Sequence, residues 1–360
     1  MNETSSTVLA NPASAIARSE LEGVVRAHEL FLARGSGGKR AKLVSRSLAN
    51  VDLSNRNLSE ADFTGSVLYG ANLRFANFER ANLYCTDLRN IDGRCGNFSH
   101  ADMRGATLNG SNLSNAKLDH ADFRAGRLAQ HGLWGSGGVI DRNGSASGVD
   151  FSFCSLRGAS FESANLKDAN FSGAFIHATK FKGARLGNAT FEDAVISEVN
   201  LSELAVPASA FKNCVLPPPP EAEALVPHLL VRLQAHKRWT DSDGRIGSSA
   251  ILDGMDLRPL GSAIGRFTLT AISARSVIAV GLDFSGAELQ GADFEGADLR
   301  GAIFEGADLR GANFRNARLR HSKFVAADLR TLQMRDGSLR PCDFRGAELS
   351  AEQTADAVLD

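Results

Sequence analysis

A run of large apolar residues at intervals of five dominates the C-terminal part of the chain. Between residues 284 and 349 every fifth residue is large and apolar, and alanine stands two positions earlier in most repeats. The large residues are Phe284, Leu289, Phe294, Leu299, Phe304, Leu309, Phe314, Leu319, Phe324, Leu329, Met334, Leu339, Phe344 and Leu349. This interval constrains the fold more than any other property of the sequence.

A five-residue interval fits neither of the regular secondary structures. In an α-helix, a step of five residues rotates by about 140°, so the apolar residues would spread around the whole rod. In a continuous β-strand, an odd interval places successive apolar residues on opposite faces. The pattern is satisfied if the chain turns a corner once per repeat, with the large residue and the residue two before it pointing inward. The chain must therefore coil around its own core.

Individual repeats such as Ala297–Gly301 (ADLRG) and Ala71–Phe75 (ANLRF) resemble the motif of the pentapeptide-repeat family, Ala-(Asp/Asn)-(Leu/Phe)-x-x. The resemblance implies an all-β fold, a right-handed quadrilateral β-helix in which four repeats form one coil. Coils stacked at about 4.8 Å would bring residues twenty positions apart into columns. We expect Phe columns on two opposite walls and Leu columns on the other two. The Asp or Asn before each central Leu or Phe is expected to hydrogen-bond to the backbone at the corner.

The repeats predict two solenoids in tandem. The first covers residues 36–216, with a loop inserted at residues 134–148, and the second covers residues 248–349. Four consecutive prolines, Pro217–Pro220, predict a stiff spacer between them. Gly93 interrupts the central residues of the first solenoid. At the start of the second, the expected central residues before the register shifts to Phe284 are Leu252, Leu257, Phe267, Ile272, Val277 and Leu282.

Helical segments are expected to cover the ends of the solenoids, because an open end exposes backbone edges and an apolar layer. After a flexible tail at residues 1–18, a capping helix is predicted at residues 19–35, starting at Ser19 with Glu22 as a capping box. Residues 217–247 are predicted to form the proline-rich linker and a second capping helix. Residues 350–360 are predicted to form a C-terminal cap helix. His28 and His236 recur in the first two helices and are interpreted as packing or capping residues.

Composition is typical of a soluble cytoplasmic protein that does not span a membrane. The chain has 360 residues, 43% of them hydrophobic, and a net charge of −1. The polar N-terminus lacks the apolar core of a signal peptide, and no apolar run reaches membrane-spanning length. His100 and His120 should stack in one column, but no third ligand completes a metal site. No catalytic constellation, cofactor motif or disulfide framework is recognised, so we expect no enzyme and no cofactor.

Outward positions provide the candidate interaction residues. Acidic residues dominate residues 284–309 and basic residues dominate residues 310–349, so the second solenoid is polarised along its axis. Twenty-residue columns are predicted to align Arg300, Arg320 and Arg340 on one wall, and Arg310 with Arg330 on the opposite wall. Like charges about 4.8 Å apart repel, so these columns require solvent, interleaved carboxylates or an anionic partner. Outward aromatic residues at Tyr69, Phe75, Tyr84 and Trp134 are the other candidates.

Two classes of function remain open from the sequence. The first is a scaffold without catalysis that binds an unknown protein partner. The second is binding of nucleic acid or another polyanion through the Arg-rich end of the second solenoid. Within the first class, some pentapeptide-repeat proteins imitate DNA and bind DNA gyrase, which protects against quinolones or toxins. That version requires a negative surface, which the nearly balanced solenoid charges do not favour. The family resemblance also implies a homodimer through the C-terminal segment.

Overall fold

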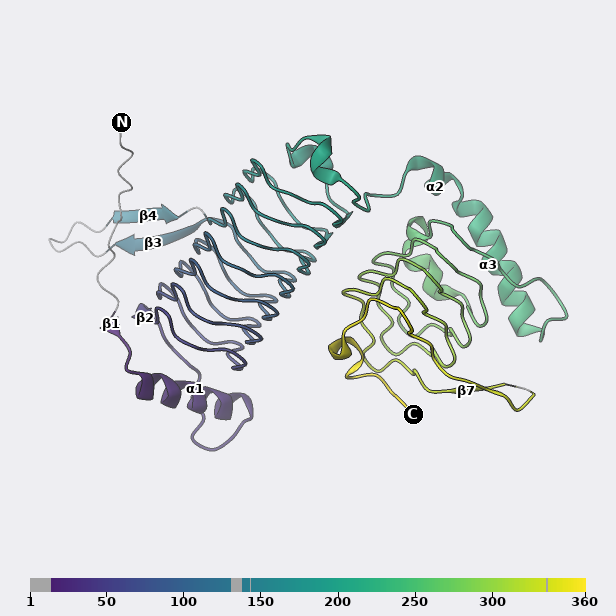
Figure 1. Ribbon diagram of the computed structural model, residues 1–360, viewed down its shortest axis with the longest axis horizontal. Helices are drawn as coiled ribbons and strands as arrows, with labels where there is room; N and C mark the ends of the chain where they lie inside the picture. Colours follow the sequence, from purple (N-terminus) through teal and green to yellow (C-terminus); the bar gives the residue numbers. More distant parts are fainter. Residues whose placement is uncertain (1–13, 131–137, 143, 335) are drawn as a thin grey trace. The chain divides into compact units, whose positions relative to one another are not determined.

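The structure of the chain is a computed structural model that describes residues 14–130, 138–142, 144–334 and 336–360 (Figure 1). The chain divides into two compact units between Leu216 and Pro217. Each unit has its own hydrophobic core, and its backbone is wound into stacked coils. The chain folds as a repeat β-helix, because it pairs with itself in parallel at regular intervals along the sequence.

Neighbouring coils are joined by parallel backbone pairing between residues that are twenty positions apart. Asp52 pairs with Asn72 and Asn72 pairs with Asp92, and the same register continues through most of both units. Within the ladder, the Leu68 N–H donates to the Asp87 carbonyl oxygen at 2.7 Å. These bonds satisfy the backbone groups of each coil through its neighbours, which compensates for their burial.

Each corner is a tight turn that begins at the central residue. The Ala71 N–H donates to the Leu68 carbonyl oxygen at 3.0 Å, and Gly70 between them has φ 67°. A four-residue turn with positive φ at its third position is a type II turn, which favours Gly or Asn there. At Asp52 and Asp62, the carboxylate accepts the backbone N–H two residues later, as predicted for the residue before the central one.

Phenylalanine columns fill the core as the alternating pattern predicts. Phe284 and Phe304 stack with ring centroids 5.2 Å apart, and Phe294 and Phe314 stack at 5.5 Å. Rings from the two columns meet edge to face at about 6 Å. Gly93 does not interrupt the coil, because the side chain of Leu113 fills the space where a Cβ atom would lie.

The first unit begins with β1 and helix α1, which lie against its first coil. Helix α1 buries Leu21, Val25 and His28, and Leu21 and Val25 belong to the same core cluster as the inward residues of the coils. β1 pairs in parallel with β2, and β5 pairs in parallel with β6, whereas β3 and β4 form an antiparallel hairpin. The elements are β1 (Ser14–Ala15), α1 (Arg18–Leu32), β2 (Arg46–Ser47), β3 (Gly126–Gln130), β4 (Gly138–Arg142), β5 (Phe175–His177), β6 (Val195–Ser197), η1 (Leu201–Glu203) and η2 (Ala208–Phe211).

The second unit begins with two consecutive helices, and the second of these covers its first coil. Helix α3 carries Pro227 in its first turn, as predicted, and buries Leu229, Leu233 and His236. Near the C-terminus, β7 and β8 form a short antiparallel hairpin. The elements are α2 (Pro220–Ala224), α3 (Val226–Asp241), η3 (Arg258–Arg266), β7 (Leu332–Gln333), β8 (Leu339–Arg340) and η4 (Ala351–Thr354).

The insertion in the first unit begins earlier than predicted. The chain leaves the coil after Phe123, forms the hairpin of β3 and β4, and resumes the ladder at Ser145, which pairs with Thr107. The predicted inserted loop at residues 134–148 is therefore wrong in its bounds. Leu128 follows Phe123 at the five-residue interval, so the sequence pattern counted the first strand of the hairpin as another repeat. The predicted repeat residue Leu133 and the predicted contact residue Trp134 lie outside the described residues.

A second insertion interrupts the C-terminal repeats, which the sequence pattern had presented as continuous. Met334 and Leu339 are not core residues, because they lie on the hairpin of β7 and β8 and are 39% and 69% exposed. Phe344 takes the place expected for Met334 and stacks on Phe314 with ring centroids 5.0 Å apart. The hairpin lies so close to the corner at Gly311 that a Cβ atom there would be 2.7 Å from Leu332 Cβ.

The register at the start of the second unit differs from the prediction. Ile272, Val277 and Leu282 occupy the inward position normally taken by alanine, while Ala274 and Ala279 are the central residues of the ladder. The extra residues that shift the register lie in η3, since Ile251 pairs with Ser273 instead of with a residue twenty positions on. Large and small inward residues have exchanged places, which preserves the volume of the core.

The predicted caps also need correction at their ends. Ser14–Ala15 form β1, so the predicted flexible tail at 1–18 is wrong for its last residues. Helix α1 has Ala17 as its N-cap without a side-chain hydrogen bond, instead of the predicted Ser19 capping box. The predicted C-terminal helix is only the short 3-10 turn η4, although its Ser350–Gln353 capping box forms. The following segment adds Val358 to the ladder beside Asp328.

Candidate interaction surfaces

The arginines that follow an aspartate across a central residue, in the pattern Asp-x-Arg, are paired with that aspartate. In the repeat of Leu309, Arg310 Nε donates to Asp308 Oδ1 at 2.9 Å and Arg310 Nη2 donates to Asp308 Oδ2 at 2.6 Å. The two residues flank a central residue, so both point outward from the same wall. We call this two-point contact the Asp–Arg fork. It recurs at Arg89, Arg94, Arg104, Arg124, Arg258, Arg300, Arg330 and Arg345.

The fork at Asp308 keeps this carboxylate ionised. Burial alone would raise the pKa of Asp308, but hydrogen bonds from Arg310 and Gln290 outweigh it, and the pKa lies below its ordinary value. The same contact raises the pKa of Arg310. Arg310 also lies 3.7 Å from Asp328, the carboxylate of the next coil. Arg310 and Arg330 therefore share a column, as predicted, but carboxylates alternate with them and neutralise their charge.

The other predicted arginine column is not continuous. Arg300 and Arg320 lie in the same column, because the Gly301 N–H donates to the Arg320 carbonyl oxygen. The side chain of Arg300 is only 4% exposed and forms the fork with Asp298. The next coil brings Glu348 beside Arg318, so Arg340 does not extend this column. Arg340 instead belongs to β8, because the β7–β8 insertion shifts the later coil.

The predicted aromatic contact residue Tyr84 has a structural role. Its hydroxyl donates to the Arg127 carbonyl oxygen at 2.8 Å and accepts the Arg127 N–H. The Arg104 guanidinium lies over its ring, 5.4 Å from the centroid. Tyr84 thus ties the first strand of the β3–β4 hairpin to the wall. It is not available as an open contact surface.

Tyr69 and Phe75 remain exposed, with 40% and 46% of their surface accessible. The Tyr69 hydroxyl accepts a hydrogen bond from Asn90 at 3.1 Å, and Arg89 lies over the ring at 5.6 Å. The guanidinium of Arg74 lies over Phe75 at 5.6 Å. Both rings are therefore held in place on the surface, Tyr69 at the second and Phe75 at the third position of a corner turn.

A fourth aromatic side chain, Phe153, joins Phe75 at the same corner. Backbone hydrogen bonds connect the corners of successive coils in the order Phe75, Cys95, Asn115 and Phe153. Phe153 is 39% exposed, and Cys95 is exposed between the two rings. We call these four residues the corner stripe. The sequence analysis missed Phe153 because the β3–β4 insertion breaks the twenty-residue spacing; counting the column across the insertion would have found it.

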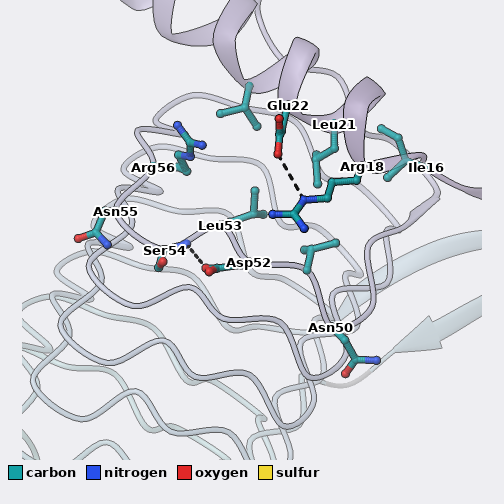
Figure 2. Close-up of a pocket in the computed structure, with 12 residues that line it drawn as sticks. Ile16, Arg18, Leu21, Glu22, Asn50, Asp52, Leu53, Ser54, Asn55 and Arg56 are labelled. Atoms are coloured by element: carbon teal, nitrogen blue, oxygen red, sulfur yellow. Dashed lines mark hydrogen bonds and ion pairs between the residues drawn. The ribbon is translucent and has the colours of Figure 1, made fainter.

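A groove of about 740 Å³ lies between helix α1 and the first coil (Figure 2). Ile16, Leu21 and Leu53 contribute apolar surface, and an ion pair between Arg18 and Glu22 at 3.4 Å lies along the helix side. On the coil side, hydrogen bonds from the Ser54 hydroxyl and backbone N–H lower the pKa of Asp52. An ionised, satisfied carboxylate is unsuited to act as a general acid near neutral pH.

Among the residues that the structure describes, histidine and cysteine side chains form no recognisable reactive cluster. His100 and His120 stack as predicted, with ring centroids 4.8 Å apart. Cys154 is buried, donates its thiol to the Leu113 carbonyl oxygen, and has a pKa raised by burial. Within the described ranges, no group of three or more His, Cys, Asp or Glu side chains could hold a metal ion. None of the helices in the described parts is long and apolar enough to cross a bilayer.

Comparison with known proteins places this architecture in a family. The family model described as pentapeptide repeats matches more than half of the chain, at residues 47–84, 72–110, 97–128, 147–183, 280–316 and 312–350. Among solved structures, the pentapeptide repeat protein HetL of the cyanobacterium Nostoc sp. strain PCC 7120 is 19% identical over 95% of this chain and 94% of its own, with a TM-score of 0.25.

Two further solved structures are similar to parts of the chain. QnrB1, a plasmid-mediated fluoroquinolone resistance protein, is 15% identical over 53% of this chain and 97% of its own, with a TM-score of 0.21. A pentapeptide repeat protein from the thylakoid lumen of Arabidopsis thaliana is 30% identical over 26% of this chain and 73% of its own, with a TM-score of 0.16. No curated protein matches the chain. On the evidence of the family model and the coiled architecture, this chain belongs to the pentapeptide repeat family.

Proposed function

We propose that this protein is a non-enzymatic scaffold that binds a protein partner through the corner stripe of its first unit. The supporting observation is the backbone conformation of the two exposed rings. Phe75 has φ 57° and Phe153 has φ 56°, in the left-handed region that costs an L-residue about 1–2 kcal/mol. Other corners in this unit carry Gly70, Asn90 and Gly110, which adopt this conformation at lower cost, and polar residues such as Glu60, Arg80 and His100, whose side chains suit an exposed position.

Stability alone does not account for a phenylalanine at these corners. The side chains leave 46% and 39% of their surface in solvent, so burial offsets only part of the backbone cost. Backbone strain combined with exposed apolar surface is typical of binding sites. Aromatic rings are also enriched at the centres of protein interfaces, where they supply large contact areas at low entropic cost. The corner stripe is therefore suited to contact an apolar surface on another protein.

The finer architecture behind this proposal is a pair of right-handed quadrilateral solenoids in tandem, each closed by its own helix. Parallel pairing at twenty-residue intervals in both units supports it, as does the burial of Leu21 beneath α1 and of Leu229 beneath α3. Limited proteolysis tests it, because cleavage around Pro217–Pro220 should release two fragments that resist further digestion. Rapid degradation of either fragment after that first cleavage would contradict the arrangement.

Polyanion binding receives less support from the geometry. The arginines proposed for it are mostly held in Asp–Arg forks, which lower the net positive charge presented to a phosphate backbone. Binding of DNA gyrase by an acidic surface receives less support from the described residues, since the outward carboxylates of the forks are neutralised in the same way. A homodimer through the C-terminal segment, where η4 and Val358 close the last coil, remains a separate proposal.

Photo-crosslinking tests the proposed surface. With a photoreactive phenylalanine analogue at position 153, the protein should crosslink to a defined partner in extract from its native host. Phe75→Asn combined with Phe153→Asn should reduce capture of that same partner at least tenfold. Arg80→Asn is the matched control, because Arg80 is exposed at another corner with φ 56°. Equal capture by the double variant and by wild type would refute the assignment of the corner stripe.

A further inference from the structure

Both units hold their covering helix to the first coil through the same histidine contact. Nδ1 of His28 in α1 accepts the backbone N–H of Ala41 at 3.1 Å, and Nδ1 of His236 in α3 accepts the backbone N–H of Ala250 at 3.1 Å. Ala41 and Ala250 are buried residues at the start of the coils of their units. The two imidazoles have no exposed surface. In later repeats the N–H at this position donates to the central residue of the preceding corner turn, as Ala61 does to Leu58. The histidine contact thus pairs a buried backbone N–H that has no such turn before it at the solenoid end.

The hydrogen bonds define the protonation state of His28. Its Nε2 lies 2.9 Å from the Ser59 carbonyl oxygen, which only accepts, so Nε2 must carry the proton. Nδ1 must then be unprotonated in order to accept the Ala41 N–H. A second proton on Nδ1 would place two N–H groups against each other and break this bond. His236 uses the same nitrogen against Ala250, so protonation at Nδ1 has the same consequence there.

The surroundings of both rings favour the neutral form. Burial lowers the pKa of His28 below its ordinary value of 6.5. The charged groups near it are Glu29 on α1 and Arg40 and Glu60 on the adjoining coil segment, while the ring of Phe31 stacks 5.9 Å away. The two carboxylates oppose the effect of Arg40, so their charges partly cancel.

Burial also lowers the pKa of His236. Its ring stacks on Trp239 at 5.6 Å, and its described surroundings contribute the backbone of Thr270 and no charged side chain that shifts the pKa. The two sites therefore differ in their charged neighbours but share the geometry at Nδ1. A shared response to acid would have to come from that nitrogen.

We propose that His28 and His236 are pH-sensitive latches that release the covering helices from the solenoid ends in mild acid. Each latch is closed when its imidazole is neutral and opens when Nδ1 takes up a proton. Opening exposes the backbone edge at Ala41 or Ala250 together with the adjacent inward residues Leu43 and Leu252. An uncovered edge of this kind pairs readily with another edge, so release of the helix also makes the solenoid end available for association.

The direction of the pH dependence follows from the pKa shifts. Both histidines have pKa values lowered by the closed state, so the open state binds more protons as the pH falls. The stabilisation of the closed state is fully present above the ordinary pKa of 6.5 and decreases as the pH falls towards the lowered values. One proton taken up per latch raises the opening equilibrium by about tenfold per pH unit within this range.

Hydrogen exchange on the full chain, corrected for intrinsic rates, tests the proposal at pH 7.5 and pH 5.5. Wild-type amides in α1, in α3 and at Ala41 and Ala250 should lose about tenfold in protection at pH 5.5. In His28→Asn the amide oxygen still accepts the Ala41 N–H but does not titrate, so α1 should lose its response while α3 keeps it. His236→Asn should show the reverse, so each variant is the control for the other.

Two results would overturn the latch. One is equal protection of both helices at the two pH values in wild type, and the other is a pH response of α1 that His28→Asn leaves unchanged. If the Asn variants do not fold, NMR titration of the wild-type imidazoles decides the question. The proposal requires Nδ1 of His28 to be unprotonated at pH 7.5 and both pKa values to lie below 6.5. A pKa at or above 6.5 for either ring refutes its latch.

Discussion

The hydroxyl of Tyr84 hydrogen-bonds to both backbone groups of Arg127, although the two residues are far apart in sequence. This contact connects the wall of the first unit to β3, the first strand of the inserted hairpin (Figure 1). A two-stranded hairpin is marginally stable by itself, so such an anchor determines how well it is ordered. The tyrosine thus fixes an insertion that the repeats do not encode.

Tyr84→Phe should loosen the hairpin while leaving the coils intact. Loss of a hydroxyl that satisfies two backbone groups should cost about 1 kcal/mol, mostly as local opening. Hydrogen exchange at residues 126–130 should therefore rise more than exchange at Leu83. Tyr69→Phe is the control, because the Tyr69 hydroxyl accepts only a side-chain bond from Asn90. Unchanged exchange in β3 would show that the hairpin is ordered without this anchor.

Removing fork carboxylates should strengthen binding of polyanions. In Asp308→Asn combined with Asp328→Asn, Arg310 and Arg330 lose their neutralising partners, so retention on heparin should extend to higher salt. Asp52→Asn with Asp62→Asn removes the same number of charges, but those carboxylates bind backbone N–H groups and hydroxyls instead of arginines. If this control gained as much retention, net charge and not the fork would be responsible.

Gly93→Ala should destabilise the first unit by about 1–3 kcal/mol through overpacking. A Cβ atom at this position would lie 2.6 Å from Leu113 Cδ2, and Leu113 is fully buried. Chemical denaturation of the single variants and of Gly93→Ala/Leu113→Ala measures the coupling. The double variant should be more stable than the sum of the single losses predicts, because the smaller side chain makes room for the methyl group. If the two single losses of stability simply added up in the double variant, the close contact between residue 93 and Leu113 would be contradicted.

Asp343 should make the last coil sensitive to strong acid. A side-chain hydrogen bond from Arg345 is the main cause that lowers the pKa of Asp343 to about 2. A lowered carboxyl pKa gives stabilisation that is complete above the ordinary value of 3.8 and is lost as the pH falls through about 2. Arg345→Gln should move the NMR titration midpoint of Asp343 upward towards 3.8. A midpoint that does not move would exclude the fork as the cause.

Phe75→Asn should raise the stability of the first unit by up to about 1 kcal/mol, since Asn tolerates the left-handed conformation better than Phe does. Thermal unfolding provides the measurement. Tyr69→Asn removes a ring of similar exposure from a position with ordinary backbone, so it should bring no gain. A clear loss of stability in Phe75→Asn would mean that the ring stabilises the fold, and the argument for a binding role would fail.

The five-residue pattern predicted the coiled backbone and the stacked Phe columns, because both depend on local geometry. The pattern failed where an insertion, or an exchange of large and small inward residues, left apolar residues at intervals of five. Leu128, Met334 and Leu339 fall on the five-residue interval but belong to hairpins. Ile272 and Val277 were predicted as central residues because they are apolar and five residues apart, yet Ala274 and Ala279 are the central residues. An apolar residue at the right interval does not reveal which way it points.

The sequence by itself therefore determined the repeat β-helix, its tight corners and the need for covered ends. Each of these follows from the recurring five-residue interval and from the requirement to bury the apolar residues that it spaces. Only the tertiary structure decided which outward residues are neighbours, because column membership depends on every insertion between two coils. It brought Phe153 to the corner of Phe75, separated Arg340 from Arg320, and placed His28 and His236 against the first backbone groups of their units.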